Sequence, residues 1–365
     1  MPTMLINSFA VQIHSGAQGN PMENKHLVKD IVHALDIDGG STERRPVHTV
    51  GVGATGFFKP SPMAQRFCVA EHFLPKAAKK GVRVDIRFSN GMGVVEEHDG
   101  WSDVRGMAVR FYLENGQSTD LVAMTLPVFF APTPETFLDF ALNARPKPCQ
   151  RATPWQKIKS YLQLQLPLPD PYPGQTERPN EGAIAFASKH VWAQPAVIDA
   201  SSIGAPVSYV RATYHAVHTF IVTGKDGQRR WVRFSWAPIA GVLNTDPKKP
   251  PEDRYLKKDL EKRLSHGRTE RFSLMMQIGE TGDDFNDSTR QWPPHRTRVM
   301  MGTLTLNKVR EDQQEYFEKL SFNPWHLTDG IDPSDDPVLR IRKDVYAFSS
   351  NRRQGTPCPF SGTKG

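Results

Sequence analysis

Alternation of apolar and polar residues over short segments is the feature that most restricts the fold of this chain. The alternation is clean at 82–88 (VRVDIRF) and 105–113 (RGMAVRFYL), and looser over 47–58. Successive side chains of a β-strand point to opposite faces, so this pattern predicts half-buried strands. Residues 119–130 (TDLVAMTLPVFF) are mainly apolar and predict a strand that is buried on both faces.

More strands are predicted in the second half of the chain. Residues 218–236 indicate a hairpin that turns at 225–228, and 271–279 and 298–309 indicate two further strands. A proline-rich segment, 163–182, separates the two groups of strands. Since strands lie on both sides of it, we interpret this segment as a long excursion within one barrel rather than a linker. The sequence therefore predicts an α+β fold, an antiparallel β-barrel with surrounding helices.

Helical spacing of apolar residues appears near 26–35, over 61–81 and over 334–354. On the last of these helices Arg342 and Tyr346 are four residues apart, so they share one face. Because no linker is evident, we expect the whole chain to form a single domain. Its expected parts are an extended N-terminal arm (1–44), the barrel and the last helix (45–354), and a tail (355–365).

The composition argues against several classes of protein. Lys plus Arg exceed Asp plus Glu by seven (46 minus 39), and the densest basic run, 248–263, is interleaved with acidic residues. Nucleic-acid binding needs a concentrated basic patch, so we interpret this run as the solvated face of an amphipathic helix. The three cysteines are too few and scattered for a disulfide framework or a zinc site, and Cys358 has no evident partner. Without a secretory signal or a membrane-spanning apolar run, a cytoplasmic protein is expected.

His48 stands at the head of a glycine-rich stretch, GVGATG at 51–56. By itself it is a weak indicator, because most histidines are hydrogen-bonded core or surface residues. Arg87 and Ser89 are two apart on a predicted strand and face the same side, so they could present a cation and a hydroxyl to one pocket. Two exposed polar residues on a surface strand would produce the same spacing.

These segments together resemble the catalase superfamily over about residues 44–354, because several pieces occur in the same order with similar spacing. The pieces are Val47-His48 with Gly51, Gly53 and Gly56, IRFS (86–89), SDVRGMAVRFY (102–112), DLVAMTLPVFF (120–130), VHTF (217–220), and Arg342 with Tyr346. The resemblance implies a catalase-like antiparallel barrel that binds haem b.

On the proximal side, the resemblance implies that Tyr346 is the axial ligand of the haem iron. Arg342, one helical turn away, would favour the charged form of this ligand. The residues that match the haem-propionate partners of the family are Arg45, Arg87 and Arg353. The neighbouring Arg352 is equally basic, so the last match could be displaced by one residue.

On the distal side, the resemblance implies that His48 moves a proton between the two oxygens of a peroxide. Ser89 would accept or donate a hydrogen bond to His48 and so orient its ring. Val47 and Phe137, and more loosely Phe140, match residues that line the cofactor pocket in the family.

Two departures separate this sequence from true catalases. Met124 stands where catalases have a distal asparagine, and a thioether cannot donate a hydrogen bond. The chain also ends soon after Tyr346, so the C-terminal helical domain of catalases is expected to be missing. We therefore expect a peroxidase that reduces hydrogen peroxide or organic hydroperoxides with a small organic reductant, with weak catalase activity at most.

Two other hypotheses stay open. Catalase-related enzymes that rearrange fatty-acid hydroperoxides (allene oxide or epoxy alcohol synthases) share the tyrosine and the histidine. The allene oxide synthases typically have threonine where this chain has Val47. A haem carrier is the other hypothesis, but a carrier has no need of an oriented acid–base such as His48 with Ser89. Analogy with the family also suggests a homo-oligomer, a dimer or tetramer.

Overall fold

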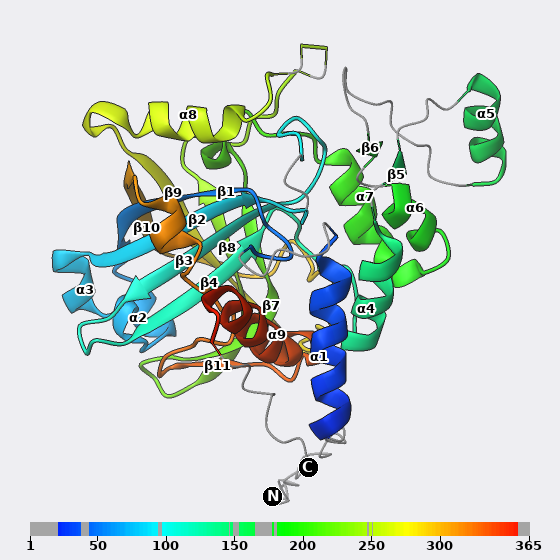
Figure 1. Cartoon of the computed structure of the whole chain (residues 1–365). Coiled ribbons are helices and arrows are strands. Elements are labelled where there is room, and N and C mark those ends of the chain that lie inside the picture. The colour runs from blue at the N-terminus through cyan, green and yellow to red at the C-terminus, as the bar shows by residue number, and fades with distance from the viewer. Residues whose placement is uncertain are drawn as a thin grey trace, which may run out of the picture.

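The centre of the computed structural model is a closed antiparallel β-barrel, as predicted (Figure 1). The residues that the structure describes are 21–37, 44–93, 97–145, 147–148, 153–164, 177–178, 181–246, 248–249 and 251–356. Around the barrel the strands follow the order β7, β4, β3, β2, β1, β10, β9 and β8, and β8 pairs back with β7. Their bounds are β1 Gly51–Pro60, β2 Val82–Asn90, β3 Arg105–Tyr112, β4 Ser118–Met124, β7 Tyr214–Thr223, β8 Arg229–Pro238, β9 Glu270–Ile278 and β10 Arg298–Val309.

Large side chains fill the barrel, which is a packed core and not a channel. Phe58, Phe111 and Trp236 are at most 2 % exposed. The ring of Phe58 meets the other two edge-on, with centroids 5.3 Å and 6.2 Å away. Each such ring stabilises the fold by roughly 1.5–3 kcal/mol through burial alone. The alternating segments therefore supply the core face of the sheet, and the barrel provides a rigid support for residues at its rim.

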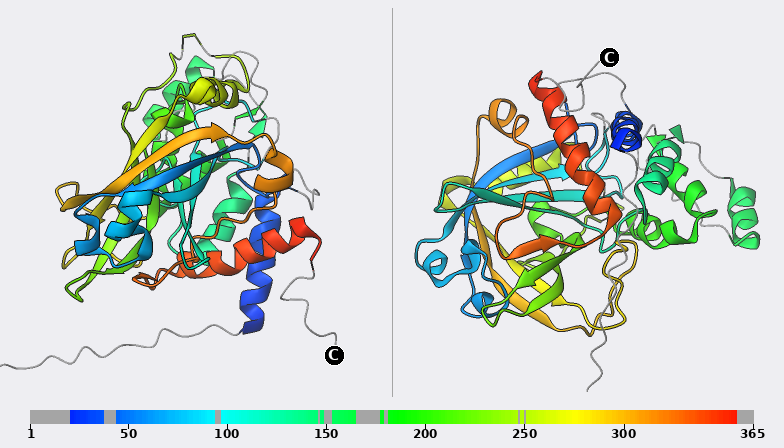
Figure 2. Two further views of the ribbon diagram at one scale, coloured as in Figure 1. Left: turned by 90° about the vertical axis from the view of Figure 1, so that its left-hand side faces the viewer. Right: turned by 90° about the horizontal axis from the view of Figure 1, so that it is seen from below.

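Helices lie around the barrel (Figures 1 and 2). At one end α1 (Pro21–Leu35), α4 (Pro134–Asn143) and α9 (Pro337–Gln354) contact one another. Beside β10 lies α8 (Tyr255–Arg263). The remaining elements are α2 Ala64–Phe67, α3 Pro75–Lys80, α5 Pro154–Leu162, α6 Glu181–Ala187, α7 Gln194–Ser202, a two-stranded sheet of β5 Lys147–Pro148 and β6 Glu177–Arg178, β11 Ile331–Pro333 beside β7, a π-helical turn Gln313–Phe317, and short 3-10 turns at Glu71–Phe73, Val191–Ala193, Tyr209–Arg211 and Ser265–Gly267.

Two predicted elements differ from the structure. The expected single helix at 61–81 is broken into short pieces. Cys68 is extended (φ −146°, ψ 127°) and ends α2, and Leu74 is extended (φ −77°, ψ 156°) because it precedes Pro75. The expected strand at 119–130 ends at Met124, and the residues that follow form turns. Pro127 within that stretch has no N–H to donate to a sheet. The end of β4 at Met124 places this residue at the rim of the barrel, where a site can form.

Several expectations concern residues beyond those described. Of the expected arm at 1–44, the structure describes α1 and little else, and much of 163–182 lies outside the described residues, as do Cys149 and Cys358. Cys68 is buried. None of the described helices has the length and apolar character that a membrane crossing requires.

Candidate active site

One cavity of about 300 Å³ lies between the rim of the barrel and the helices α1, α4 and α9. Its walls are mostly apolar and aromatic. Every site residue predicted from the sequence lines it, although these residues come from segments far apart in the chain. They are Arg45, Val47, His48, Arg87, Ser89, Phe137, Arg342, Tyr346 and Arg353, together with Met124 and Phe140.

His48 lies in a turn before β1, not on the strand that the sequence predicted from residue 47. Its φ of 56° is a left-handed conformation that residues other than glycine rarely adopt. Its Nδ1 lies 2.8 Å from the carbonyl oxygen of Asn90 and 3.0 Å from Ser89 Oγ. Because a carbonyl can only accept, the proton sits on Nδ1, and Nε2 carries the free lone pair.

The pKa of His48 falls from its usual value to about 4, first because burial disfavours the imidazolium and then because the guanidinium of Arg87 repels it. The ring also needs the glycine at position 106. A Cβ there would stand 2.6 Å from Ser89 Oγ and 2.9 Å from His48 Nδ1. The site therefore holds a neutral imidazole in one tautomer at neutral pH, the state required of a general base.

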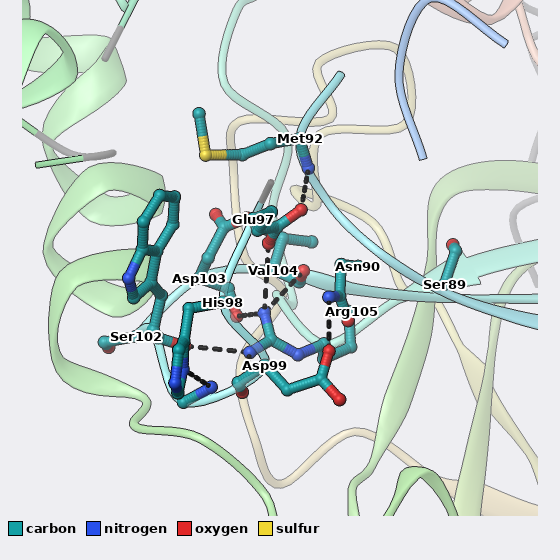
Figure 3. Close-up of polar contacts among 12 residues, drawn as sticks. Ser89, Asn90, Met92, Glu97, His98, Asp99, Ser102, Asp103, Val104 and Arg105 are labelled. Atoms are coloured by element: carbon teal, nitrogen blue, oxygen red, sulfur yellow. Dashed lines mark hydrogen bonds and ion pairs between the residues drawn. The ribbon is translucent and has the colours of Figure 1, made fainter. Parts of the chain in front are cut away.

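A buried polar network fixes the backbone that orients His48 (Figure 3). The amide of Asn90 donates to Asp99 at 2.9 Å and accepts from the hydroxyl of Tyr209 at 2.9 Å. Arg105 is fully buried and donates to the carbonyl oxygens of Asp99 and Trp101, each at 2.8 Å. Since the side-chain amide of Asn90 is held on both sides, the backbone carbonyl of the same residue is a rigid acceptor for the His48 ring.

On the opposite wall, Tyr346 ends a chain of hydrogen bonds that begins at the N-terminus of α9. Arg342 donates to the Tyr346 hydroxyl at 2.6 Å and to His218 Nε2 at 2.8 Å. His218 Nδ1 donates to Asp336 Oδ2 at 2.7 Å. Burial is the main reason why the pKa of His218 is lowered, so the ring is neutral and can accept from Arg342. Asp336 is also the N-cap of the helix.

Sequence reasoning missed His218 and Asp336 as site residues. His218 lies in the VHTF segment that carried the resemblance, and Asp336 occupies the expected capping position of the last helix. Each was visible as a local feature, but the pairing between them, 118 residues apart, was not. Together they hold the guanidinium of Arg342 against the phenol of Tyr346.

Three arginines gather at one end of the cavity around Glu318, a further residue that the sequence did not suggest. Glu318 forms ion pairs with Arg45 and, at 3.0 Å, with Arg87. Arg353 Nε donates to the carbonyl oxygen of Glu318 at 3.2 Å. Arg353 lines the cavity, whereas the neighbouring Arg352 pairs with Asp36 at 2.9 Å. Of the two, Arg353 is therefore the one placed to interact with a ligand in the cavity.

The glycines of β1 make room for this arginine cluster. A Cβ on Gly51 would stand 2.7 Å from the guanidinium carbon of Arg87, and one on Gly53 would stand 2.0 Å from the ring of Phe317. Gly53 also exchanges two hydrogen bonds with the side chain of Gln313. The glycine stretch therefore lets the segment that carries Glu318 pack directly on the barrel.

Met124 lies in the same cavity, 9 % exposed, and pairs in register with Gly106, the glycine that contacts His48. Its neighbours in the core are apolar, among them Leu126, Val128 and Phe129. Met124 therefore places a thioether beside the glycine that contacts His48, and it adds no hydrogen-bond donor to this wall.

The residues around the cavity fit the haem that the resemblance implies. A phenol with a guanidinium at 2.6 Å is a suitable oxygen ligand for iron, and a cluster of arginines suits carboxylate groups. Apolar and aromatic walls, including Phe137 and Phe140, suit a flat apolar ring. The neutral imidazole of His48 lines the same cavity, where it can act on a bound substrate.

Comparisons with known proteins point to one family and one fold. The family model described as Catalase matches residues 10–166 and 180–358. The catalase-related peroxidase of Mycolicibacterium paratuberculosis is 31 % identical over 313 residues, which cover 85 % of this chain and 89 % of that protein. The catalase-related peroxidase of Synechococcus elongatus is 26 % identical over 318 residues, 86 % of this chain and 85 % of that protein. A fungal catalase crystal structure has a TM-score of 0.69 at 23 % identity, covering 96 % of this chain and 67 % of that chain, which shows a shared fold.

Proposed function

The chain belongs to the catalase family, and on that premise we propose that it is a haem-dependent peroxidase that reduces hydrogen peroxide or organic hydroperoxides with a small organic reductant. The observation that carries the proposal is that a neutral, oriented histidine and an arginine-paired tyrosine line one cavity. A protein that only stored haem would not need the histidine side of this arrangement.

Haem b would be held by residues at three places. Tyr346 would ligate the iron through its phenol oxygen, and Arg342, which donates a hydrogen bond to that oxygen, would favour the anionic form of the ligand. Arg45, Arg87 and Arg353 would pair with the two propionates. When bound, haem supplies an iron centre that exchanges electrons with a peroxide.

His48 would carry the proton transfer. Its Nδ1–H is held by Asn90, so Nε2 is the atom that can accept the proton of the hydroperoxide. The same nitrogen then returns that proton to the oxygen that leaves as water or as an alcohol. The lowered pKa, about 4, keeps Nε2 unprotonated before each turnover at neutral pH.

Met124 supports the part of the proposal that limits catalase activity. Reaction with a second hydrogen peroxide requires that small polar molecule to be positioned in the distal cavity, and a thioether cannot donate a hydrogen bond to it. The apolar surface formed by Met124, Phe129 and Phe137 favours an organic molecule instead. We therefore propose that an organic reductant completes the cycle. The homo-oligomeric state and the cytoplasmic location stay predictions.

The test compares three reactions of the purified haem-loaded protein: hydrogen peroxide with a phenolic reductant, hydrogen peroxide alone, and a polyunsaturated fatty-acid hydroperoxide. We expect oxidation of the phenol to be fastest. Rapid oxygen release from hydrogen peroxide alone would refute the limit on catalase activity, and rearranged lipid products without a reductant would favour the hydroperoxide-rearranging hypothesis. Failure to develop a Soret band after haem reconstitution would refute the haem premise.

Two substitutions test the assigned roles. His48→Ala should lower turnover by about 10²–10⁴-fold while the Soret band is retained. His266 provides a matched control, because it has the same φ of 56° but is exposed, so His266→Ala should leave turnover unchanged. Tyr346→Phe should impair haem ligation and change the Soret spectrum. Full activity of the His48 variant would contradict the proton-transfer role.

A further inference from the structure

Glu318 is the anionic centre of the arginine cluster. Its carboxylate pairs with Arg45 and with Arg87, and its own carbonyl oxygen accepts from Arg353. Burial alone would raise its pKa, but Arg87 and Arg45 hold the pKa below its usual value, so the side chain is ionised at neutral pH. The side chain is 21 % exposed, and those of Arg45 and Arg87 are 11 % and 5 % exposed.

The charges of the cluster have a simple sum. Three guanidinium groups and one carboxylate give a net charge of +2 (three minus one). Haem b carries two propionates, with a charge of −2 when both are ionised. The chain therefore holds the arginines as a site whose remaining charge matches a dicarboxylate, which suits bidentate pairing of guanidinium with carboxylate.

The arginines would repel one another without a counter-ion. Burial lowers the pKa of Arg45 well below its usual value, and the charge of Arg87 lowers it further, whereas Glu318 raises it. Arg45 also donates to the carbonyl oxygens of Phe317 and Leu320, each at 2.6 Å, and Arg87 donates to the carbonyl oxygen of His48 at 2.9 Å. Loss of the carboxylate would therefore disturb the turn that carries His48 as well as the cluster.

We propose that Glu318 is a placeholder carboxylate that keeps the three arginines folded in place until haem propionates arrive, and that it competes with those propionates for the same guanidinium groups. The inference rests on the proposed function, because it requires that the cavity takes haem. Glu318 is thus a positioning residue: it stabilises the haem-free chain more than the haem-loaded one, and its removal weakens the former without loosening haem.

Glu318→Gln removes the charge and keeps the shape, so it separates these two effects. In the haem-free full-length chain the variant should unfold at a temperature lower by about 4 °C or more, because a buried ion-paired group has lost its partner. In the haem-loaded protein, transfer of haem to an excess of a haem-scavenging apomyoglobin should be no faster than in the unsubstituted protein. A residue that acted only as a structural support would speed haem loss together with the fall in thermal stability.

Two companion variants make the test specific. Glu315, exposed and three residues earlier in the same segment, is the control, and Glu315→Gln should change neither quantity. Glu318→Asp keeps the charge and should recover part of the lost stability, which also covers the case in which Glu318→Gln fails to fold. Either an unchanged unfolding temperature of haem-free Glu318→Gln or faster haem loss from it overturns the proposal. Failure of the unsubstituted protein to take up haem would refute the proposed function instead. The unfolding temperatures of the haem-free chains do not test the proposed function.

Discussion

Replacing Asp336 by asparagine should break the hydrogen-bond chain that ends on Tyr346, although the side chain keeps its shape. Asp336 Oδ2 accepts from His218 Nδ1, and His218 Nε2 accepts from Arg342. If the amide of Asp336→Asn keeps its oxygen on the helix N-terminus, it presents its NH₂ group to His218. A neutral imidazole has one N–H, so His218 can accept from that amide only by moving its proton to Nε2. That N–H then faces Arg342, which has no acceptor.

The expected cost follows from the contacts that change. Asparagine caps a helix about as well as aspartate, so the bonds to Val338 N (2.8 Å) and Leu339 N (3.3 Å) contribute little to the difference. His218 and Asp336 are 2 % and 1 % exposed, so the broken contacts lie in the interior. His218 is neutral, so the contact that is lost is a buried hydrogen bond to a charged group, which contributes about 1.5–3 kcal/mol. With an unfolding entropy of roughly 2.1 cal/mol/K per residue, a chain of 365 residues should lose about 2–4 °C in Tm.

Thermal unfolding followed by circular dichroism measures this loss, and the adjacent residue is a matched control. The carboxylate of Asp335 is 83 % exposed and pairs with Arg340 on the surface, so Asp335→Asn should shift Tm by less than about 1 °C. If the two variants unfold at the same temperature, the tautomer argument is refuted. A lowered Tm in Asp336→Asn without any change in the Soret spectrum of the haem-loaded protein would show that the disturbance stops before Tyr346.

Three further outcomes are expected. His72 is buried, and burial lowers its pKa to about 3, below the value of about 6.5 in the unfolded chain. The free energy of unfolding is therefore unaffected by His72 above its unfolded pKa and falls as the pH drops from there toward 3, by about 2 kcal/mol between pH 8 and pH 5. Urea unfolding should show that His72→Leu lacks this pH-dependent decrease. Met124→Asn should raise oxygen release from hydrogen peroxide by about tenfold on an oxygen electrode, since one hydrogen bond contributes about 1.4 kcal/mol to positioning. Gly106→Ala should destabilise the fold by about 1–3 kcal/mol through overpacking. It should also lower the peroxidase turnover of the protein that stays folded, because its Cβ would displace Ser89 and His48. Unchanged turnover would contradict that contact.

The parts of the fold that the sequence predicted are those encoded by short-range patterns. Alternation predicted the strands that became β2, β3, β9 and β10 within about two residues, because a half-buried strand requires its pattern wherever it lies. The i, i+4 spacing placed Arg342 and Tyr346 on one face of α9, and the structure joins them by a hydrogen bond. Each of these inferences needs only neighbours in the chain and a known helix or strand geometry.

The errors occurred where a proline or a contact distant in the sequence overruled the local pattern. Pro75 interrupts the helical pattern predicted at 61–81. β4 ends at Met124, although the apolar residues from which a longer strand was predicted continue to residue 130. His48 was expected on a strand, yet it adopts φ 56° in the turn before β1. Its ring is held there by Asn90, a contact 42 residues away, which no pattern around His48 indicates.

The same limit explains why Glu318 escaped notice while its three arginines did not. The resemblance assigned Arg45, Arg87 and Arg353 to the propionates of a ligand. With that assignment, there was no reason in the sequence to look for a carboxylate of the chain itself as their partner. Yet guanidinium groups withdrawn from water require counter-ions in the folded chain itself, because folding cannot depend on charges that are left unpaired until a cofactor arrives. The chain therefore has to contain at least one carboxylate beside them. Only closure of the barrel identifies it, because Glu318 lies 273 residues from Arg45 in the sequence and is in direct contact with it in the fold.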